Sequence, residues 1–172
     1  GSGLAQVNWI QGAAADIAGY IVYLANPLGG WDSIDYVSGI SNTTYTNLFS
    51  AAGTRSEGYS IAAVDNCGNT SAIGVGHNTI FLSGTLDKCS ADLTLTWNGY
   101  SGWSGGVAGY SIYTNLNGND TLLGTTSATT FVHTNLTKDA TFCYSVSCYD
   151  GTGKSSTSNR FCIVANVTRP PA

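Results

Sequence analysis

The stretch IAGYIVY at residues 17–23 returns as VAGYSIY at residues 107–113, ninety residues further along the chain. Both stretches are rich in the aromatic and β-branched residues that favour a strand. Three more stretches repeat in the same order at offsets of 88, 88 and 85 residues. They are Val7–Trp9 with Leu95–Trp97, Tyr45–Leu48 with His133–Leu136, and Asp65–Ser71 with Asp150–Ser156. Four matches in one order predict two copies of one domain.

Each copy reads as short strands without a helical segment. In the second copy, Leu93, Leu95 and Trp97 should share an inward face. A longer inward row is expected from Phe142, Tyr144, Val146 and Cys148. Turns are predicted where Gly and Asn cluster, at residues 29–30, 117–119 and 151–153. The predicted fold class is all-β, with two tandem β-sandwich modules over residues 1–78 and 79–172, the first lacking its first strand.

Composition excludes several classes of partner. Six Lys and Arg residues against ten Asp and Glu residues give a formal net charge of −4. So few cations form no basic patch, which argues against nucleic acid and against anionic membrane surfaces as partners. No apolar run reaches membrane-spanning length, so membrane insertion is not expected. Five cysteines without a CxxC motif and only two histidines do not make a zinc site, and neither a metal nor another cofactor is expected.

The repeated residues resemble those of fibronectin type III domains. The resemblance is carried by Trp9 and Trp97 on the second strand, the Tyr-x-Ile/Val-Tyr pattern on the third, and Asn-Leu at residues 47–48 and 135–136. It implies an immunoglobulin-like sandwich in each copy. The aromatic residue expected at the corner before the penultimate strand falls at Phe142 in copy two. In copy one it falls at Glu57 or a nearby residue, and there the aromatic is predicted to be lost.

A narrower resemblance concerns the strings AVDNCGNTS, WNGYSGWSGGVAGYSIY and FCYSV…SNRFC. They are similar to repeats of large cell-surface proteins of the Bacteroidota, which are associated with gliding motility and exported by type IX secretion. The resemblance implies a secreted or cell-surface location for an internal or processed piece of such a protein. An oxidising compartment is also what five cysteines without a metal motif favour.

Two disulfides are expected. Cys143 and Cys162 sit around the turn at 151–153 with the index sum of directly opposed hairpin residues, so a cross-strand bond is predicted. Cys148 has the opposite parity to Cys143 and should be a buried thiol. Cys67 and Cys89 are then paired by elimination, with the family resemblance pointing the same way. That bond requires the intervening segment to fold back; without it, residues 77–78 are a simple junction.

Two tryptophans and two hydroxyl residues are the remaining candidates. Trp31 and Trp103 lie in Gly-rich loops, where an indole can stack on a sugar or a partner protein. For Trp103 the favoured alternative is packing against the neighbouring domain. In the Bacteroidota, Asp-(Ser/Thr)-apolar triplets carry O-glycans, and that resemblance implies glycosylation at Ser33 and Thr121. The two lie 88 residues apart, which predicts that they are equivalent positions in the two copies.

These observations predict an extracellular structural or adhesive repeat module of a large surface protein or filament, acting as a spacer or protein–protein interaction unit. Expected partners are other repeats of the same parent, including self-association, and a surface protein or glycan. The alternative is a carbohydrate-binding accessory module of a secreted polysaccharide-processing enzyme, motivated by the loop tryptophans. An enzyme is not expected, because the sequence has no GxSxG context and its carboxylates lie in turns.

Overall fold

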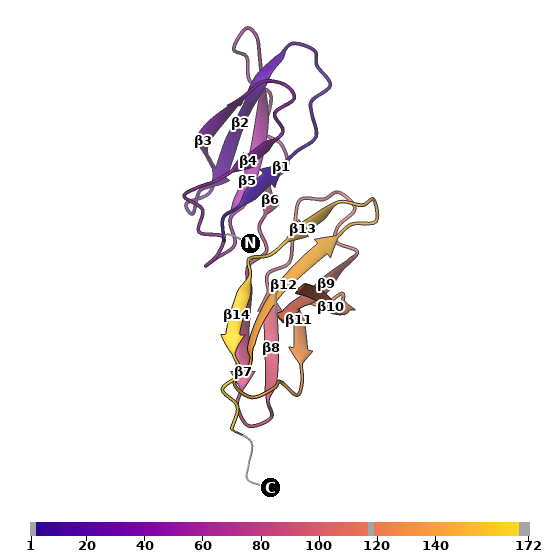
Figure 1. Ribbon diagram of the computed structural model, residues 1–172. Coiled ribbons are helices and arrows are strands. Elements are labelled where there is room, and N and C mark those ends of the chain that lie inside the picture. Colours follow the sequence, from indigo (N-terminus) through magenta and orange to yellow (C-terminus); the bar gives the residue numbers. More distant parts are fainter. Residues whose placement is uncertain (1–2, 117–118, 169–172) are drawn as a thin grey trace. The chain divides into compact units, whose positions relative to one another are not determined.

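The computed structural model describes residues 3–116 and 119–168 (Figure 1). The chain divides into two compact units, module one (Leu4–Thr79) and module two (Ile80–Ala172). This division lies one residue beyond the boundary expected from the sequence. Among the described residues every regular element is a β-strand, and none forms a helix long and apolar enough to cross a membrane.

Module one is built from six strands: β1 (Gln6–Asn8), β2 (Ile17–Ala25), β3 (Trp31–Ser38), β4 (Thr44–Thr46), β5 (Gly58–Asp65) and β6 (His77–Asn78). They form a two-stranded sheet, β1-β4, and a four-stranded sheet in the order β3-β2-β5-β6. All of the pairings are antiparallel. Because β6 pairs with the first residues of β5, residues 77–78 belong to the sheet of module one. The alternative expectation that they are a simple junction is therefore wrong.

Module two contains eight strands: β7 (Leu82–Asp87), β8 (Asp92–Trp97), β9 (Gly109–Leu116), β10 (Asn119–Thr126), β11 (Thr130–His133), β12 (Thr141–Tyr149), β13 (Ser155–Thr157) and β14 (Phe161–Val164). One sheet has the order β11-β8-β7. The other has the order β10-β9-β12, with β13 and β14 both pairing with β12. The turn predicted at residues 117–119 lies largely outside the described residues.

The two modules have the same strand arrangement except at one position. Strands β8 to β12 of module two correspond in order and pairing to β1 to β5 of module one, whereas β7 has no counterpart there. In each module the larger and smaller sheets pack through one apolar core. The chain is therefore all-β, with two tandem sandwiches of the immunoglobulin and fibronectin type III kind, as predicted. Within the described residues, no strand of module one pairs with the outer edge of β1.

The core of module two follows the alternation expected from the sequence. Leu93 and Leu95 are fully buried and Trp97 is 6% exposed. The row from Phe142 to Cys148 on β12 is buried at every second residue. Trp97 meets Tyr110 edge-on across the sheets, with ring centroids 5.5 Å apart, and Trp9 meets Tyr20 in the same way at 5.3 Å. Trp9 after β1 and Trp97 at the end of β8 therefore make the same contact with a tyrosine of the opposite sheet in their own modules.

The corner tyrosine of module one is present, which corrects the prediction that the aromatic is lost at Glu57. Register places Tyr59 on β5 where Tyr144 lies on β12, because the β2 and β9 partners, Leu24 and Thr114, are ninety residues apart. The Tyr59 hydroxyl accepts a hydrogen bond from Asn47 Nδ2 at 2.9 Å and donates one to Glu57 at 2.8 Å. The side chain is buried. The corner aromatic of module one is therefore Tyr59, two residues after Glu57.

The cysteines divide into one bonded pair and three thiols. Cys143 and Cys162 are direct register partners on β12 and β14 and form the predicted disulfide, with an S–S distance of 2.05 Å. Cys148 is a buried thiol, as expected from its parity. The predicted Cys67–Cys89 bond is not formed, and both of these thiols are exposed.

Each of these two thiols lies at the end of a strand in its own module. Cys67 follows the end of β5, whereas the chain leaves module one beside the beginning of that strand, where β6 pairs. Cys89 follows the end of β7, whereas the chain enters module two at its beginning. An eight-residue strand and a six-residue strand span roughly 26 Å and 20 Å. Each cysteine is therefore a strand length away from the residues that join the modules.

Candidate interaction surface

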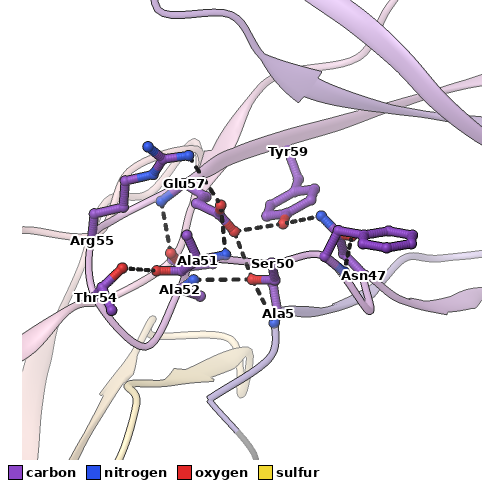
Figure 2. A network of polar contacts seen from close by, with 11 residues as sticks. Ala5, Asn47, Ser50, Ala51, Ala52, Thr54, Arg55, Glu57 and Tyr59 are labelled. Atoms are coloured by element: carbon purple, nitrogen blue, oxygen red, sulfur yellow. Dashed lines mark hydrogen bonds and ion pairs between the residues drawn. The ribbon is translucent and has the colours of Figure 1, made fainter.

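A buried carboxylate organises the loop between β4 and β5 of module one (Figure 2). Glu57 is 6% exposed. It accepts hydrogen bonds from Ser50 Oγ at 2.6 Å, from the Ala51 amide at 2.9 Å and from the Tyr59 hydroxyl at 2.8 Å. A buried charge requires such partners, because removing it from water is otherwise strongly unfavourable. The loop is thus built around Glu57.

The same network ties the loop to both ends of the module. Ser50 Oγ accepts a hydrogen bond from the Ala5 amide at 3.0 Å, immediately before β1. At the other end, the Glu57 amide donates to Thr79 Oγ1 at 2.9 Å and the Thr79 amide donates to the Glu57 carbonyl at 2.8 Å. Ala5, next to the first residue of module one, and Thr79, its last residue, are therefore fixed to the residues around Glu57.

The electrostatics of the network favour one protonation state. Burial alone would raise the pKa of Glu57. The hydrogen bonds from Ser50, Ala51 and Tyr59, together with the Arg55 guanidinium 3.7 Å away, lower that pKa overall. Burial raises the pKa of Tyr59 to about 12. At neutral pH Glu57 is therefore ionised and Tyr59 protonated.

A carboxylate already held by three donors is a poor general base, because protonation would break those bonds. We therefore assign the Glu57 network a stabilising role.

Among the described residues no three His, Cys, Asp or Glu side chains are grouped closely enough to hold a metal ion.

The outer edge of β1 is the second notable feature. The Ala5 carbonyl accepts from the Asn47 amide and the Trp9 amide donates to the Thr43 carbonyl, both at 3.0 Å. Backbone groups of alternate residues point to opposite sides of an antiparallel strand. The N–H and C=O groups of Gln6 and Asn8 therefore point away from β4. Within the described part of the chain, no strand pairs with them.

Module two shows how the corresponding edge is covered. Thr94 and Thr96 on β8 correspond to Gln6 and Asn8 at offset 88, and they lie opposite Thr85 and Ser83 of β7. The apolar faces also differ. Trp97 is buried beside Leu82 of β7, its register partner, whereas the equivalent Trp9 is only half-buried. Among the described residues, β1 is thus an edge strand, and its apolar face is less covered than that of β8.

Trp31 lies at the first position of β3 and is half-buried. Its ring packs on the backbone of the same module. A methyl group added at Gly76 would lie 2.6 Å from the indole, and one added at Gly58 would lie 3.9 Å away. Only glycine leaves room for the ring at Gly76. Part of the indole surface that was considered for a ligand therefore contacts module one itself.

Trp103 lies in the loop between β8 and β9 and is also half-buried. Its ring is tilted against Tyr100, with centroids 4.2 Å apart, and it packs on the core of module two. This gives the indole a structural contact within its own module, where the expectation was a contact with the neighbouring domain or with a ligand.

Ser33 and Thr121 are exposed, on the edge strands β3 and β10. They are not equivalent positions, which corrects the expectation. Ser33 is the register partner of Tyr23, whereas the partner of the equivalent Tyr113 is Leu122, so the true offset is 89 residues. A shift of one residue along a strand reverses the face, so the two hydroxyls project from opposite faces of their sheets.

Two exposed apolar residues adjoin the Glu57 network, and the sequence marked neither of them as an exposed surface residue. Leu48 is 72% exposed and Phe49 is 95% exposed, and both follow the buried Asn47. The Asn47 side chain accepts the Phe49 amide at 3.0 Å, so the polar network fixes the backbone that presents them. Asn47 and Leu48 have identical counterparts in copy two, Asn135 and Leu136, so the Asn-Leu pattern indicated a structural corner. The next residue differs, because Phe49 stands where copy two has Thr137.

Comparisons with known proteins find likenesses among solved structures alone. No protein-family model and no curated protein matches the sequence. Among solved structures, the crystal structure of chicken CNTN1 FN1-FN3 domains matches with a TM-score of 0.42 and 15% sequence identity. The match covers 95% of this chain and 62% of that one. The assignment of the fold therefore rests on the strand order, register and packing described above.

Proposed function

We propose that this chain is a structural repeat unit of a secreted or cell-surface protein and acts as a spacer and protein–protein interaction unit. The observation that carries the proposal is the duplication of one β-sandwich in a single chain. Repetition of a sandwich with its own core extends a molecule by whole modules. The proposal assigns the chain no catalytic reaction.

The extracellular part of the proposal is supported by the Cys143–Cys162 disulfide, since such bonds persist in oxidising compartments. The finer proposal places the parent among the type IX secreted surface proteins of the Bacteroidota. Antibodies against the chain should label intact cells of the source organism, and labelling should be lost after external protease treatment. Labelling that requires permeabilised cells would contradict the location.

The rival function is carbohydrate binding through Trp31 and Trp103. Both indoles are half-buried and contact their own module, which leaves part of each ring for a sugar. A glycan array should show no saturable binding if the chain is a spacer and protein-binding unit. Saturable binding that is lost in Trp31→Ala or Trp103→Ala would favour the rival.

Glycosylation is a separate proposal for the exposed hydroxyls of Ser33 and Thr121. Intact mass of the native protein should exceed the sequence mass by a glycan, and Ser33→Ala and Thr121→Ala should remove it site by site. A native mass equal to the sequence mass would contradict the proposal.

A further inference from the structure

We propose that His133 makes module two sensitive to acid, because protonation of its imidazole removes the hydrogen-bond acceptor of the buried Tyr144 hydroxyl and loosens the corner at the start of β12. The inference concerns a conformational device inside module two. It goes beyond the structural role proposed above and does not depend on the cellular location.

His133 occupies the place that Asn47 has in module one. The Asn47 amide donates to the Ala5 carbonyl, and His133 is the register partner of Leu93, which lies 88 residues after Ala5. That offset is the one that relates β1 to β8. Each of the two side chains also reaches the hydroxyl of the corner tyrosine in its own module. The structural counterpart of Asn47 is therefore His133, although the sequence repeat matches it with Asn135.

The Tyr144 hydroxyl depends on His133 for a hydrogen bond. Tyr144 is 1% exposed, and its hydroxyl oxygen lies 2.7 Å from His133 Nδ1, which is its one hydrogen-bond partner among the described residues. In module one the equivalent Tyr59 hydroxyl donates to Glu57, but module two has Phe142 at that position, which offers no acceptor. The O–H of Tyr144 therefore needs Nδ1 as its acceptor, and the proton of the neutral imidazole belongs on Nε2.

Protonation of the imidazole reverses this arrangement. An imidazolium is a donor at both nitrogens, so Nδ1 can no longer accept the Tyr144 O–H. The phenol is then a buried donor without an acceptor, which destabilises the folded state. The surroundings add to this effect, because the ring of Phe142 lies edge-on to His133 with centroids 5.6 Å apart and solvates a charge poorly. Acid should therefore weaken module two at this corner.

The charged groups near His133 do not compensate for its burial. Asp92 accepts a hydrogen bond from the Asn135 amide at 3.3 Å, and within the described residues no ion pair joins His133 to a carboxylate. Burial accordingly lowers the pKa of His133. The ionisable groups on the elements around the imidazole are Asp92 on β8, Lys138 and Asp139 in the loop before β12, and Tyr144 on β12.

The direction of the pH effect follows from the lowered pKa. The neutral His133 stabilises module two fully above the ordinary imidazole pKa of about 6.5, and this stabilisation is lost as pH falls through the lower folded-state pKa. The loss begins at a higher pH than that of the Glu57 carboxylate in module one, whose ordinary pKa is about 4.3.

Scanning calorimetry of the full chain at pH 7.5 and pH 5 tests the proposal. The transition of module two should fall by several degrees, and that of module one should change less. His133→Asn supplies the uncharged amide that module one has at this position, and it should abolish the shift of module two. His77→Asn is the matched control, because it removes the other histidine of the chain, and it should leave that shift unchanged.

Nitrogen-15 NMR of the imidazole gives a second readout on the unmodified chain, which requires no variant to fold. At pH 7.5 the Nδ1 atom of His133 should carry no proton and Nε2 should carry one. Acid should protonate Nδ1 and reduce the exchange protection of the Asp139 and Ala165 amides, which hold the adjoining loop. A proton on Nδ1 at pH 7.5, an unchanged module two transition at pH 5, or an equal acid shift in His133→Asn would overturn the proposal.

Discussion

Module one and module two share five strands in the same order, yet they stabilise the corner at the start of β5 and of β12 differently. In module one the ionised Glu57 gathers hydrogen bonds from Ser50, Ala51 and Tyr59. In module two Phe142 takes the position of Glu57 and packs near His133 and Tyr144, with ring centroids 5.6 Å and 6.3 Å away. One backbone corner can therefore be held by a buried charge with a full set of donors or by aromatic packing.

The two cores also differ in how many apolar side chains they bury. Module two buries a continuous cluster to which both sheets contribute, β7 included, whereas the buried cluster of module one consists of Ala5, Val22, Ala52 and Tyr59. Partly buried side chains such as Val7 and Trp9 complete it. The difference indicates that module one depends more on its polar network and module two more on apolar burial.

The largest expected effect separates the two tryptophans. Trp97→Ala should lower the free energy of unfolding of module two by about 3–5 kcal/mol, because it removes a buried indole from the centre of the core. Trp9→Ala should cost module one less, since Trp9 is already half-exposed. Scanning calorimetry of the full chain can follow the two transitions. Equal losses in both modules would contradict the difference in core closure.

The disulfide should stabilise only module two. The bond joins residues 19 positions apart, and in the chain-entropy model its loss costs about 3 kcal/mol. Cys143→Ser with Cys162→Ser should lower the calorimetric transition of module two and leave that of module one unchanged. Cys67→Ser with Cys89→Ser is the control and should alter neither. A shift of both transitions in that control would support the Cys67–Cys89 bond that the sequence predicted.

Glu57→Gln should destabilise module one by about 1–3 kcal/mol, because a buried hydrogen-bonded carboxylate is replaced by a group that fits fewer of its donors. The pH dependence follows from the lowered pKa of Glu57. The stabilisation is fully present above the ordinary carboxyl pKa of about 4.3 and is lost as pH falls through the lower folded-state pKa. Melting temperatures between pH 7 and pH 2 should show this loss in module one, and the Gln variant should lack that component.

The smallest effect is on thiol reactivity. Burial raises the pKa of the Cys148 thiol to about 11, and its side chain is inaccessible. Iodoacetamide at pH 8 should therefore modify Cys67 and Cys89 in the folded chain and spare Cys148. Peptide mapping by mass spectrometry gives the site occupancies, and unfolding in guanidinium should make all three react. Ready modification of Cys148 in the folded chain would place it outside the core.

Features that depend on strand periodicity were predictable from the sequence. The inward rows of β8 and β12 and the Cys143–Cys162 bond follow from alternation and index sums, which need only a few consecutive residues. The copy-to-copy offset failed at Ser33 and Thr121 because the connection between the paired strands differs in length: the pair Ala25 and Trp31 encloses five residues, whereas the equivalent pair Asn115 and Asp120 encloses four. The Cys67–Cys89 pairing failed because elimination assumes that every remaining thiol needs a partner.

The Glu57 network and the outer edge of β1 were harder to predict for a different reason. Glu57 is a charged residue, and charged residues are ordinarily exposed. Its burial becomes intelligible only when Ser50, Tyr59 and Thr79 are brought together from three separate segments. A missing first strand was expected, but which backbone groups it leaves outward required the register of β1 with β4.

The passage from Thr79 to Ile80 has a mechanical consequence. Thr79 is held to Glu57 by two backbone-linked hydrogen bonds, and Ile80, joined to it by one peptide bond, is 1% exposed in the core of module two. The chain therefore has no linker residue between the two modules. Tension applied to a longer polypeptide would pass directly from the hydrogen bonds between Thr79 and Glu57 to the buried Ile80. Those hydrogen bonds would bear load before any linker residue could extend. Inserting a few Gly and Ser residues between Thr79 and Ile80 would supply compliance that the natural sequence omits.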